Sequence, residues 1–165
     1  MTETTRTPLE TGFREAMAHL CAPVAVVTAM DGARPHGTTV SAVMSLSLEP
    51  LLVAVALADT SDCLGLINAN RTFGVNVLAA DQHAVASRLA KKGREKFADL
   101  PWEVAGGVPR LSGAAVWLRC TLADTAPGGD HRILIGEVRD VATVTEAAPL
   151  TYHRRQFGTH LPHLD

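Results

Sequence analysis

The stretch from Gly37 to Leu57 constrains this chain most, because it joins two buried-strand patterns through a hydroxyl-rich turn. Residues 51–57 are a continuous apolar run, which is typical of a strand covered on both faces. Buried hydroxyl groups need hydrogen-bond partners that an apolar core does not supply, whereas a bound polar cofactor would supply them. Alternatively, these side chains bond to their own backbone in strands and turns. The hydroxyl-bearing residues are Thr38, Thr39, Ser41, Ser45 and Ser47.

Length and composition favour one globular domain. Of 165 residues, 47% are hydrophobic and 19% charged, which separates the chain from disordered proteins. The net charge of -2 provides no basic field for nucleic acid, so none is expected as a partner. The three cysteines lack the spacing of zinc or redox motifs and indicate free thiols. With no signal peptide and no apolar stretch of membrane-spanning length, we expect a soluble cytoplasmic protein without membrane contact.

Periodicity predicts two or three short helices and about six strands. Residues 9–20 carry an amphipathic helical pattern, which Pro23 ends. Ser61 or Asp62 begins a second helix, and Asp81 caps a third that runs into the basic segment 91–97. Strands are expected at 24–28, at Gly37, and at 51–57, 72–78, 114–123 and 133–144, with a loop at 106–109 and a short strand after Pro149.

These elements favour a mainly β fold, an antiparallel barrel with a few flanking helices. A doubly wound parallel sheet would need a helix after nearly every strand, and residues 114–144 carry no helical pattern. The turn at 127–131 instead predicts a long hairpin. We expect a flexible arm at 1–8, one domain at 9–158 and a tail at 159–165.

The order of several short motifs resembles the short-chain flavin reductases, which supply reduced flavin to two-component monooxygenases. The likeness covers nearly the whole chain, although each motif alone is weak. The motifs are Phe13–Met17, Val24–Thr28, Gly37–Ser41 with Ser45–Ser47 and Glu49–Pro50, Phe73–Leu78, Lys96–Phe97, Gly129–His131 with Gly136–Val138, and Pro149–Leu150 with Tyr152.

The resemblance implies a split β-barrel of the Greek-key, FMN-binding type that forms a homodimer and holds FMN or FAD near the subunit interface. In that family the segment corresponding to Thr39–Ser41 lies along the isoalloxazine ring. Many relatives carry a second serine where Ala42 stands, which bears on flavin preference. Lys92 and Lys96 are either phosphate contacts or part of a solvated basic face. The implied flavin-binding residues are Thr38, Thr39, Val40, Ser41, Ala42, Ser47, Ala58, Thr60, Ser61, Lys92, Lys96 and Phe97.

The resemblance also implies a nicotinamide site beside the Gly129–His131 turn. His131 either contacts NADH or NADPH and assists catalysis, or bonds to backbone as a structural turn residue. Arg154, Arg155 and Phe157 either bind the dinucleotide or pack on a second subunit, and Tyr152 is expected with Arg155 and Phe157 at the NAD(P)H site. His160 and His163 have no third ligand nearby in the sequence, so no metal is expected.

The function implied is that of an NAD(P)H:flavin oxidoreductase, which reduces FMN or FAD by hydride transfer and releases reduced flavin to a separate oxygenase. The flavin carries the chemistry, so no nucleophile or metal is required. The alternative is a carrier or sensor that binds flavin on the same barrel without reducing it.

Overall fold

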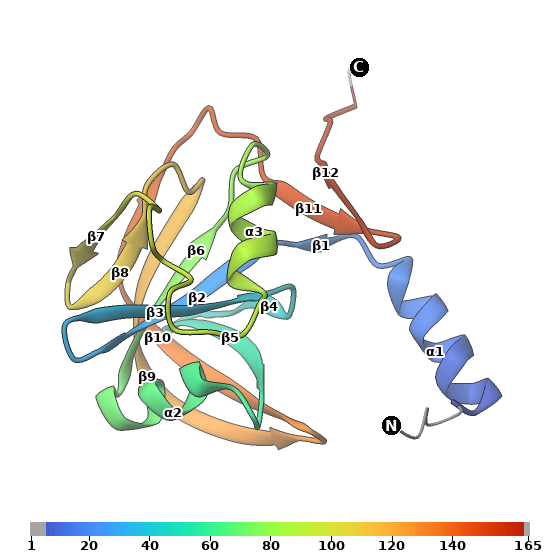
Figure 1. Cartoon of the computed structure of the whole chain (residues 1–165), viewed down its shortest axis with the longest axis horizontal. Helices are drawn as coiled ribbons and strands as arrows, with labels where there is room; N and C mark the ends of the chain where they lie inside the picture. Colours follow the sequence, from blue (N-terminus) through green and yellow to red (C-terminus); the bar gives the residue numbers. More distant parts are fainter. Residues whose placement is uncertain (1–5, 164–165) are drawn as a thin grey trace.

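A seven-stranded antiparallel sheet forms the centre of the protein, seen here in a computed structural model that describes residues 6–163 (Figure 1). The strands follow the spatial order β3-β2-β6-β9-β10-β5-β4. Their bounds are β2 Ala25–Asp31, β3 Arg34–Val40, β4 Val43–Leu48, β5 Leu51–Ala58, β6 Thr72–Val77, β9 Val116–Gly128 and β10 His131–Thr143.

This sheet rolls up so that its two edges approach each other. β3 and β4 are the edge strands, yet only Ser41 and Ala42 connect them in sequence. Three Cα–Cα steps reach at most about 11 Å, so the end of β3 lies next to the start of β4. Across residues 6–163, no β-ladder joins the two edges. The mainly antiparallel barrel architecture with a few flanking helices is thereby confirmed, and the barrel is split between β3 and β4.

Three helices flank the sheet, as predicted: α1 Pro8–Ala18, α2 Asp62–Asn70 and α3 His83–Leu89. Thr7 caps α1 through its side chain, and Glu10 bonds back to the Thr7 backbone N–H. No residue of α1, all of which is described, is buried, and the helix extends away from the sheet (Figure 1). Across residues 6–163, no helix is long and apolar enough to cross a membrane.

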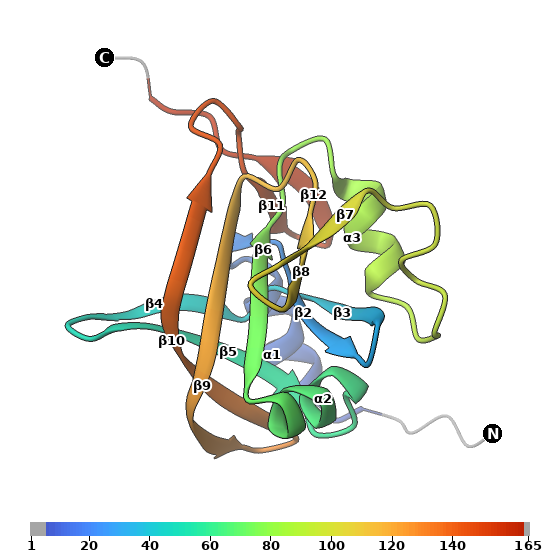
Figure 2. The same ribbon diagram turned by 90° about the vertical axis from the view of Figure 1, so that its left-hand side faces the viewer.

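Two small sheets complete the fold. β1 Ala22–Pro23, β11 Leu150–His153 and β12 Gln156–Thr159 form one, in the order β1-β11-β12. β7 Trp102–Ala105 and β8 Val108–Leu111 form the other. The β4–β5 hairpin projects outward beyond β10, and the β9–β10 hairpin forms the tall wall of the barrel (Figure 2).

Two apolar cores stabilise the arrangement. The first lies between α2 and the concave face of the sheet and contains Val27, Val55, Ile67 and Phe73. The second lies under α3, where Leu89 packs with Phe97 and other residues near the β7–β8 hairpin. Burial of this area is the main favourable contribution to folding.

Several local predictions differ from the structure. The first helix ends at Ala18 and not at Pro23, which lies in the edge strand β1, where a missing N–H is tolerated. The segment predicted as a hydroxyl-rich turn contains strand β4, which carries Ser45 and Ser47. The third helix has Gln82, not Asp81, at its N-cap position, without a side-chain capping bond, and it stops at Leu89, before the basic segment.

The remaining differences are strands that the pattern did not predict. The loop expected at 106–109 is part of the β7–β8 hairpin, and the segment after Pro149 forms two strands, β11 and β12.

Candidate functional site

A cavity of about 280 Å³ lies where the end of β3 meets the end of β5 and the start of β10. We call it the central cavity. It gathers most of the residues that the sequence assigned to flavin, together with His131. Its lining comprises Thr38, Thr39, Val40, Ser41, Ala42, Ala56, Leu57, Ala58, Ser61 and His131.

One wall of the central cavity is the free edge of the sheet. β3 pairs with β2 on one side only, so alternate backbone N–H and C=O groups of Thr38, Thr39 and Val40 have no ladder partner. The Thr39 hydroxyl already donates to the carbonyl oxygen of Ala86 on α3 at 2.8 Å. Thr39 therefore offers a ligand its backbone groups and an acceptor lone pair, while Ser41 is exposed.

His131 reaches this cavity because of strand register. It begins β10 and pairs with Ala58, the last residue of β5, and the Asp59 N–H donates to the Asp130 carbonyl at 3.0 Å. The imidazole Nδ1 lies 2.7 Å from Asp130 Oδ1. This hydrogen bond lowers the pKa of Asp130, so the carboxylate only accepts and Nδ1 carries the proton. Nε2 is then the ring atom left for a ligand.

A second, larger cavity of about 630 Å³ adjoins the first and shares Ser61 with it. We call it the arginine cavity. Thr60 lies here, at the N-terminal end of α2. Ser61 is the N-cap of α2 but makes no side-chain capping bond. The Leu64 N–H donates to the Ser61 carbonyl oxygen at 3.1 Å, so the N–H groups of Asp62 and Cys63 are those that keep their capacity for an anion. The lining comprises Asp31, Arg34, His36, Asp59, Thr60, Ser61, Asp62, Gly65, Leu66 and Arg94.

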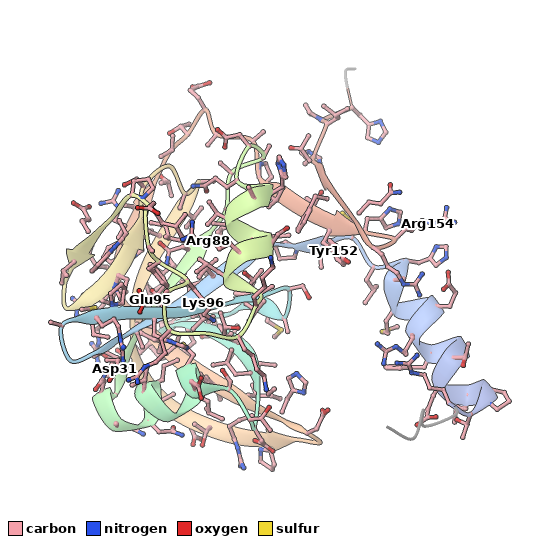
Figure 3. All side chains as sticks on the ribbon, in the orientation of Figure 1. Asp31, Arg88, Glu95, Lys96, Tyr152 and Arg154 are labelled. Atoms are coloured by element: carbon pink, nitrogen blue, oxygen red, sulfur yellow. The ribbon has the colours of Figure 1, made fainter. Side chains whose placement is uncertain are left out.

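Lys96 lies near this helix end, in the middle of the molecule as labelled in Figure 3. Its Nζ donates to the Leu89 carbonyl oxygen at 3.3 Å. Burial lowers the pKa of Lys96 from its usual 10.5, and Asp62 on α2 partly offsets this. The amine is thus partly desolvated and close to the helix end, where a phosphate would gain most from its charge.

A third cavity, of about 470 Å³, lies on the other side of the β3 end, under α3 and the β11–β12 hairpin. We call it the aromatic cavity. It contains Tyr152, Arg155 and Phe157, and the two aromatic rings lie 5.3 Å apart between centroids. Thr39, Val40 and Ser41 line both this cavity and the central one. Within residues 6–163, His131 and the other three nicotinamide candidates therefore do not share one cavity.

Four predicted flavin residues, Lys96 among them, lie outside the linings of these cavities. The Ser47 hydroxyl accepts the N–H of Glu49 at 3.2 Å and supports the β4–β5 turn. Lys92 is exposed, in the loop after α3. Phe97 is 6% exposed and stacks edge-on against Trp102, because its ring fills the space beside Gly37.

Six titratable residues of the arginine cavity were not among the site residues predicted from the sequence: Asp31, Arg34, His36, Asp59, Asp62 and Arg94. Charged residues are common in hairpins and exposed loops, so their types alone carried no signal. The Asp31-Gly32 pair is typical of a hairpin turn, and Gly32 takes a φ of 61° there. What the sequence did not reveal is that the loop after α3 lies against this hairpin.

The donor set fits a flavin mononucleotide group. An unpaired strand edge and small hydroxyl side chains match the heteroatom edge of an isoalloxazine, and Ala42, Ala56 and Ala58 leave room for its flat face. The end of α2 with Lys96 matches a phosphate. Within the described residues no group of three His, Cys, Asp or Glu side chains is placed to hold a metal ion.

Comparison with known proteins agrees with this chemistry. The family described as flavin reductase like domain matches residues 17–160. The chain belongs to this family. It is 43% identical over 155 residues to the NADH:riboflavin 5'-phosphate oxidoreductase of Streptomyces pristinaespiralis, covering 91% of this chain and 88% of that one. The reductase component of 4-hydroxyphenylacetate 3-monooxygenase from Thermus thermophilus is 38% identical over 149 residues, covering 90% and 95%.

A solved flavin reductase shares the fold over the full length. The NADH:FAD oxidoreductase of Streptomyces globisporus, in complex with NAD and FAD fragments, superposes with a TM-score of 0.90 at 27% identity. The match covers 99% of this chain and 100% of that one. The order of elements around the central cavity is therefore that of the flavin reductases.

Proposed function

We propose that this protein is an NADH-dependent flavin reductase that supplies reduced flavin to a separate monooxygenase. The observation that carries the proposal is the central cavity, where an unpaired strand edge, small side chains and His131 meet beside the N-terminus of α2. Relatives named as NADH:flavin oxidoreductases and as reductase components of monooxygenases support it.

In this proposal the flavin ring lies along Thr38 to Ser41. Backbone groups at the β3 edge hold the heteroatom edge of the ring, and Ala42 with Ala58 pack on its face. When bound, the flavin supplies the redox chemistry by accepting a hydride from the nicotinamide. The chain itself orients the ring and keeps water from one of its faces.

The phosphate end of the flavin is assigned to Ser61, Thr60 and the first N–H groups of α2. Lys96 adds a positive charge nearby, whereas Lys92 is left to the solvent. Because a helix N-terminus and an ammonium both favour a dianion, this end adds to the affinity for the mononucleotide.

His131 is assigned to the nicotinamide side of the flavin. Its Nδ1 is held by Asp130, which leaves Nε2 to contact the reductant. A His131→Ala substitution tests this assignment.

We further propose that the protein acts as a homodimer. An isolated helix as short as α1 is marginal in water, yet its apolar stripe is open to solvent. Leu9 is 82% exposed and Phe13 62%, and Leu48 at the β4–β5 tip is 82% exposed. A second copy that covers these side chains would also bring residues to the aromatic cavity, which contains Tyr152, Arg155 and Phe157.

Light scattering tests the dimer. We expect a dimer at micromolar concentration, and Phe13→Asp should shift it toward the monomer. Arg14→Asp, which adds the same side chain to the polar face of α1, should not. A wild-type monomer with full activity would remove the role given to α1.

The function itself is tested by following NADH oxidation with and without added FMN or FAD. Oxidation that depends on added flavin is the expected result. Flavin binding without NADH oxidation would identify a carrier or sensor, and an absence of binding below about millimolar flavin would contradict the proposal. We place the protein in the cytoplasm, where NADH is available and thiols such as Cys63 remain reduced.

A further inference from the structure

The arginine cavity begins at Thr60 and Ser61, which are assigned to the flavin phosphate, and extends away from the central cavity. Three separate segments wall it: the β2–β3 hairpin, the first half of α2 and the loop that carries Arg94. Its volume of about 630 Å³ is within the range of nucleotide-binding pockets. None of the assigned roles of His131 or of the Thr38–Ser41 segment uses this space.

The position of Ser61 connects the two cavities. A flavin ring along β3 with its phosphate at Ser61 ends at the mouth of the arginine cavity. In FAD the chain of atoms continues from that phosphate through a second phosphate to adenosine, whereas in FMN it stops there. The arginine cavity is therefore where the two flavins differ.

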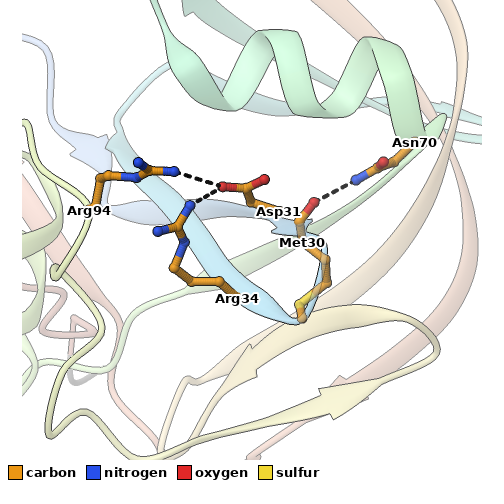
Figure 4. Close-up of polar contacts among 5 residues, drawn as sticks. All are labelled: Met30, Asp31, Arg34, Asn70 and Arg94. Carbon is orange, nitrogen blue, oxygen red and sulfur yellow. Dashed lines mark hydrogen bonds and ion pairs between the residues drawn. The ribbon is translucent and has the colours of Figure 1, made fainter.

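Two guanidinium groups converge on one carboxylate in this cavity. Arg34 donates to Asp31 Oδ2, and Arg94 approaches the same oxygen from the opposite segment at 3.9 Å (Figure 4). The hydrogen bond from Arg34 lowers the pKa of Asp31, so the carboxylate is ionised at neutral pH. The Arg94 side chain is 76% exposed and only loosely paired, which leaves most of its five donors for a phosphate.

The other carboxylates of the cavity also have cations beside them. Asp59 lies 3.7 Å from Arg132 Nε, and Asp62 interacts with Lys96. The lining itself carries two cations, Arg34 and Arg94, and three carboxylates, Asp31, Asp59 and Asp62. Arg132 and Lys96 lie outside the lining and offset the charges of Asp59 and Asp62, which leaves the two arginines against Asp31 alone. Burial lowers the pKa of His36 below 6.5, so this side chain stays neutral at pH 7.

The walls of the cavity are fixed in place. Asn70, at the end of α2, donates to the Met30 carbonyl oxygen at 2.7 Å and so ties the helix to the β2–β3 hairpin (Figure 4). Gly65 presents no side chain, and a Cβ built on it meets no atom within 4 Å. The open space beside α2 is therefore kept by a glycine in a helix, where glycine is otherwise unfavourable.

We propose that the arginine cavity binds the adenosine diphosphate half of FAD, with Arg94 and Arg34 at the second phosphate, so that the protein binds FAD more tightly than FMN. The proposal rests on the proposed function, because it requires flavin in the central cavity. Asp31 holds the two guanidinium groups in position and does not itself contact the anion. Gly65 leaves space for the nucleoside.

Flavin affinity measured on the full chain tests this directly. Dissociation constants for FMN and for FAD are obtained by fluorescence titration of the wild type, Arg94→Ala and Gly65→Leu. Arg94→Ala removes a charge, and Gly65→Leu fills the cavity without removing one. Each variant should weaken FAD binding about fivefold to tenfold and leave FMN within about twofold. Arg139→Ala, which breaks another exposed ion pair, with Glu137 on β10, is the matched control and should change neither.

The remaining outcomes separate the two hypotheses. Equal affinity of the wild type for FMN and FAD, unchanged in both variants, would overturn the inference and leave the proposed function standing. A wild type that binds neither flavin would overturn both. The same diphosphate chemistry occurs in NADH, so KM for NADH is also measured with FMN as the flavin. A raised KM in Arg94→Ala with unchanged FAD affinity would assign the cavity to the reductant and overturn the assignment to FAD.

Discussion

Two polar clusters lie side by side in this sheet, and only one of them is completed by the chain itself. Thr28 and Asn76 are fully buried on β2 and β6. Thr28 Oγ1 donates to the Pro109 carbonyl at 2.7 Å, and Asn76 Oδ1 accepts the Leu111 N–H at 2.8 Å. The neighbouring segment Thr38–Ser41 is the free edge of the same sheet, and its backbone is open to the central cavity.

The difference shows which polar residues in an apolar strand mark a ligand site. Asn76 is the most conspicuous polar exception in the sequence, yet its amide is used to hold the β7–β8 hairpin on the sheet. The hydroxyls of Thr38 and Ser41 are ordinary for a strand, yet they lie where the chain leaves hydrogen-bonding groups free. Whether a polar residue stabilises the fold or binds a ligand therefore depends on where its hydrogen-bond partner lies, and not on the residue type.

The largest effect is expected from Asn76→Leu, which disrupts the Thr28–Asn76 cluster, whose hydrogen bonds are made within the chain. The substitution leaves the Leu111 N–H without its acceptor in a buried place, so the free energy of unfolding should fall by about 2–4 kcal/mol. Urea unfolding measures it. Asn70→Leu, at an exposed amide, is the control and should cost about 1 kcal/mol or less. A similar small loss for both variants would show that the Asn76 bonds do not hold the hairpin.

His131→Ala tests the second site, the central cavity that the Thr38–Ser41 segment lines. Loss of a hydrogen bond of ~1 kcal/mol to the reductant should raise KM for NADH or lower kcat about fivefold, with flavin affinity nearly unchanged. The melting temperature should stay nearly the same, because the hydrogen bond of the half-buried imidazole within the described residues is to the exposed Asp130. His160→Ala, outside the cavities, provides the comparison. Unaltered NADH kinetics with a lowered melting temperature would instead mark His131 as a structural turn residue.

Ser41→Ala should have a smaller effect, on flavin binding in the central cavity. Its hydroxyl is exposed at the end of β3, so stability should not change while the dissociation constant for flavin rises about threefold. Ser45→Ala, in β4 and outside the cavities, should leave flavin binding as it is. If the two variants bind flavin equally well, the ring does not lie along β3.

Much of the fold could be predicted from local pattern. The apolar run at 51–57 and the hairpin at 114–144 appear as strands because their burial pattern is repeated along the chain. β7 and β12 were missed because they are short and mostly exposed, so their sequences carry little apolar periodicity. β8 is mostly buried but has only four residues, and Pro109 together with the preceding glycines indicated a loop. Pairing order lies beyond local pattern, since β3 and β4 are neighbours in sequence and opposite edges of the sheet.

The part of the site that lies along one short stretch of sequence could be predicted. Thr38 to Ala42, Ala58 and Ser61 were predicted from the family resemblance, and the structure brings them together with His131. Phe97 and Ser47 resemble site residues in sequence, but one fills the core beside Gly37 and the other supports a turn. Arg94 could not be found, because nothing local shows that its loop lies opposite Asp31.

The smallest expected effect is on the pH dependence of stability, which should involve His36 in the arginine cavity but not the Thr28–Asn76 cluster. Burial, followed by the nearby charge of Lys96, lowers the pKa of His36 from its usual 6.5, while Asp62 and Asp31 act in the opposite direction. The unfolded chain therefore binds a proton at a higher pH than the folded one, so the stability from neutral His36 is complete above about pH 6.5 and declines as the pH falls. His36→Gln should reduce this decline, measured by urea unfolding at about pH 8 and about pH 5. The Thr28–Asn76 cluster has no titratable group, so Asn76→Leu should lower stability equally at both. An undiminished decline in His36→Gln would assign the acid sensitivity to other groups.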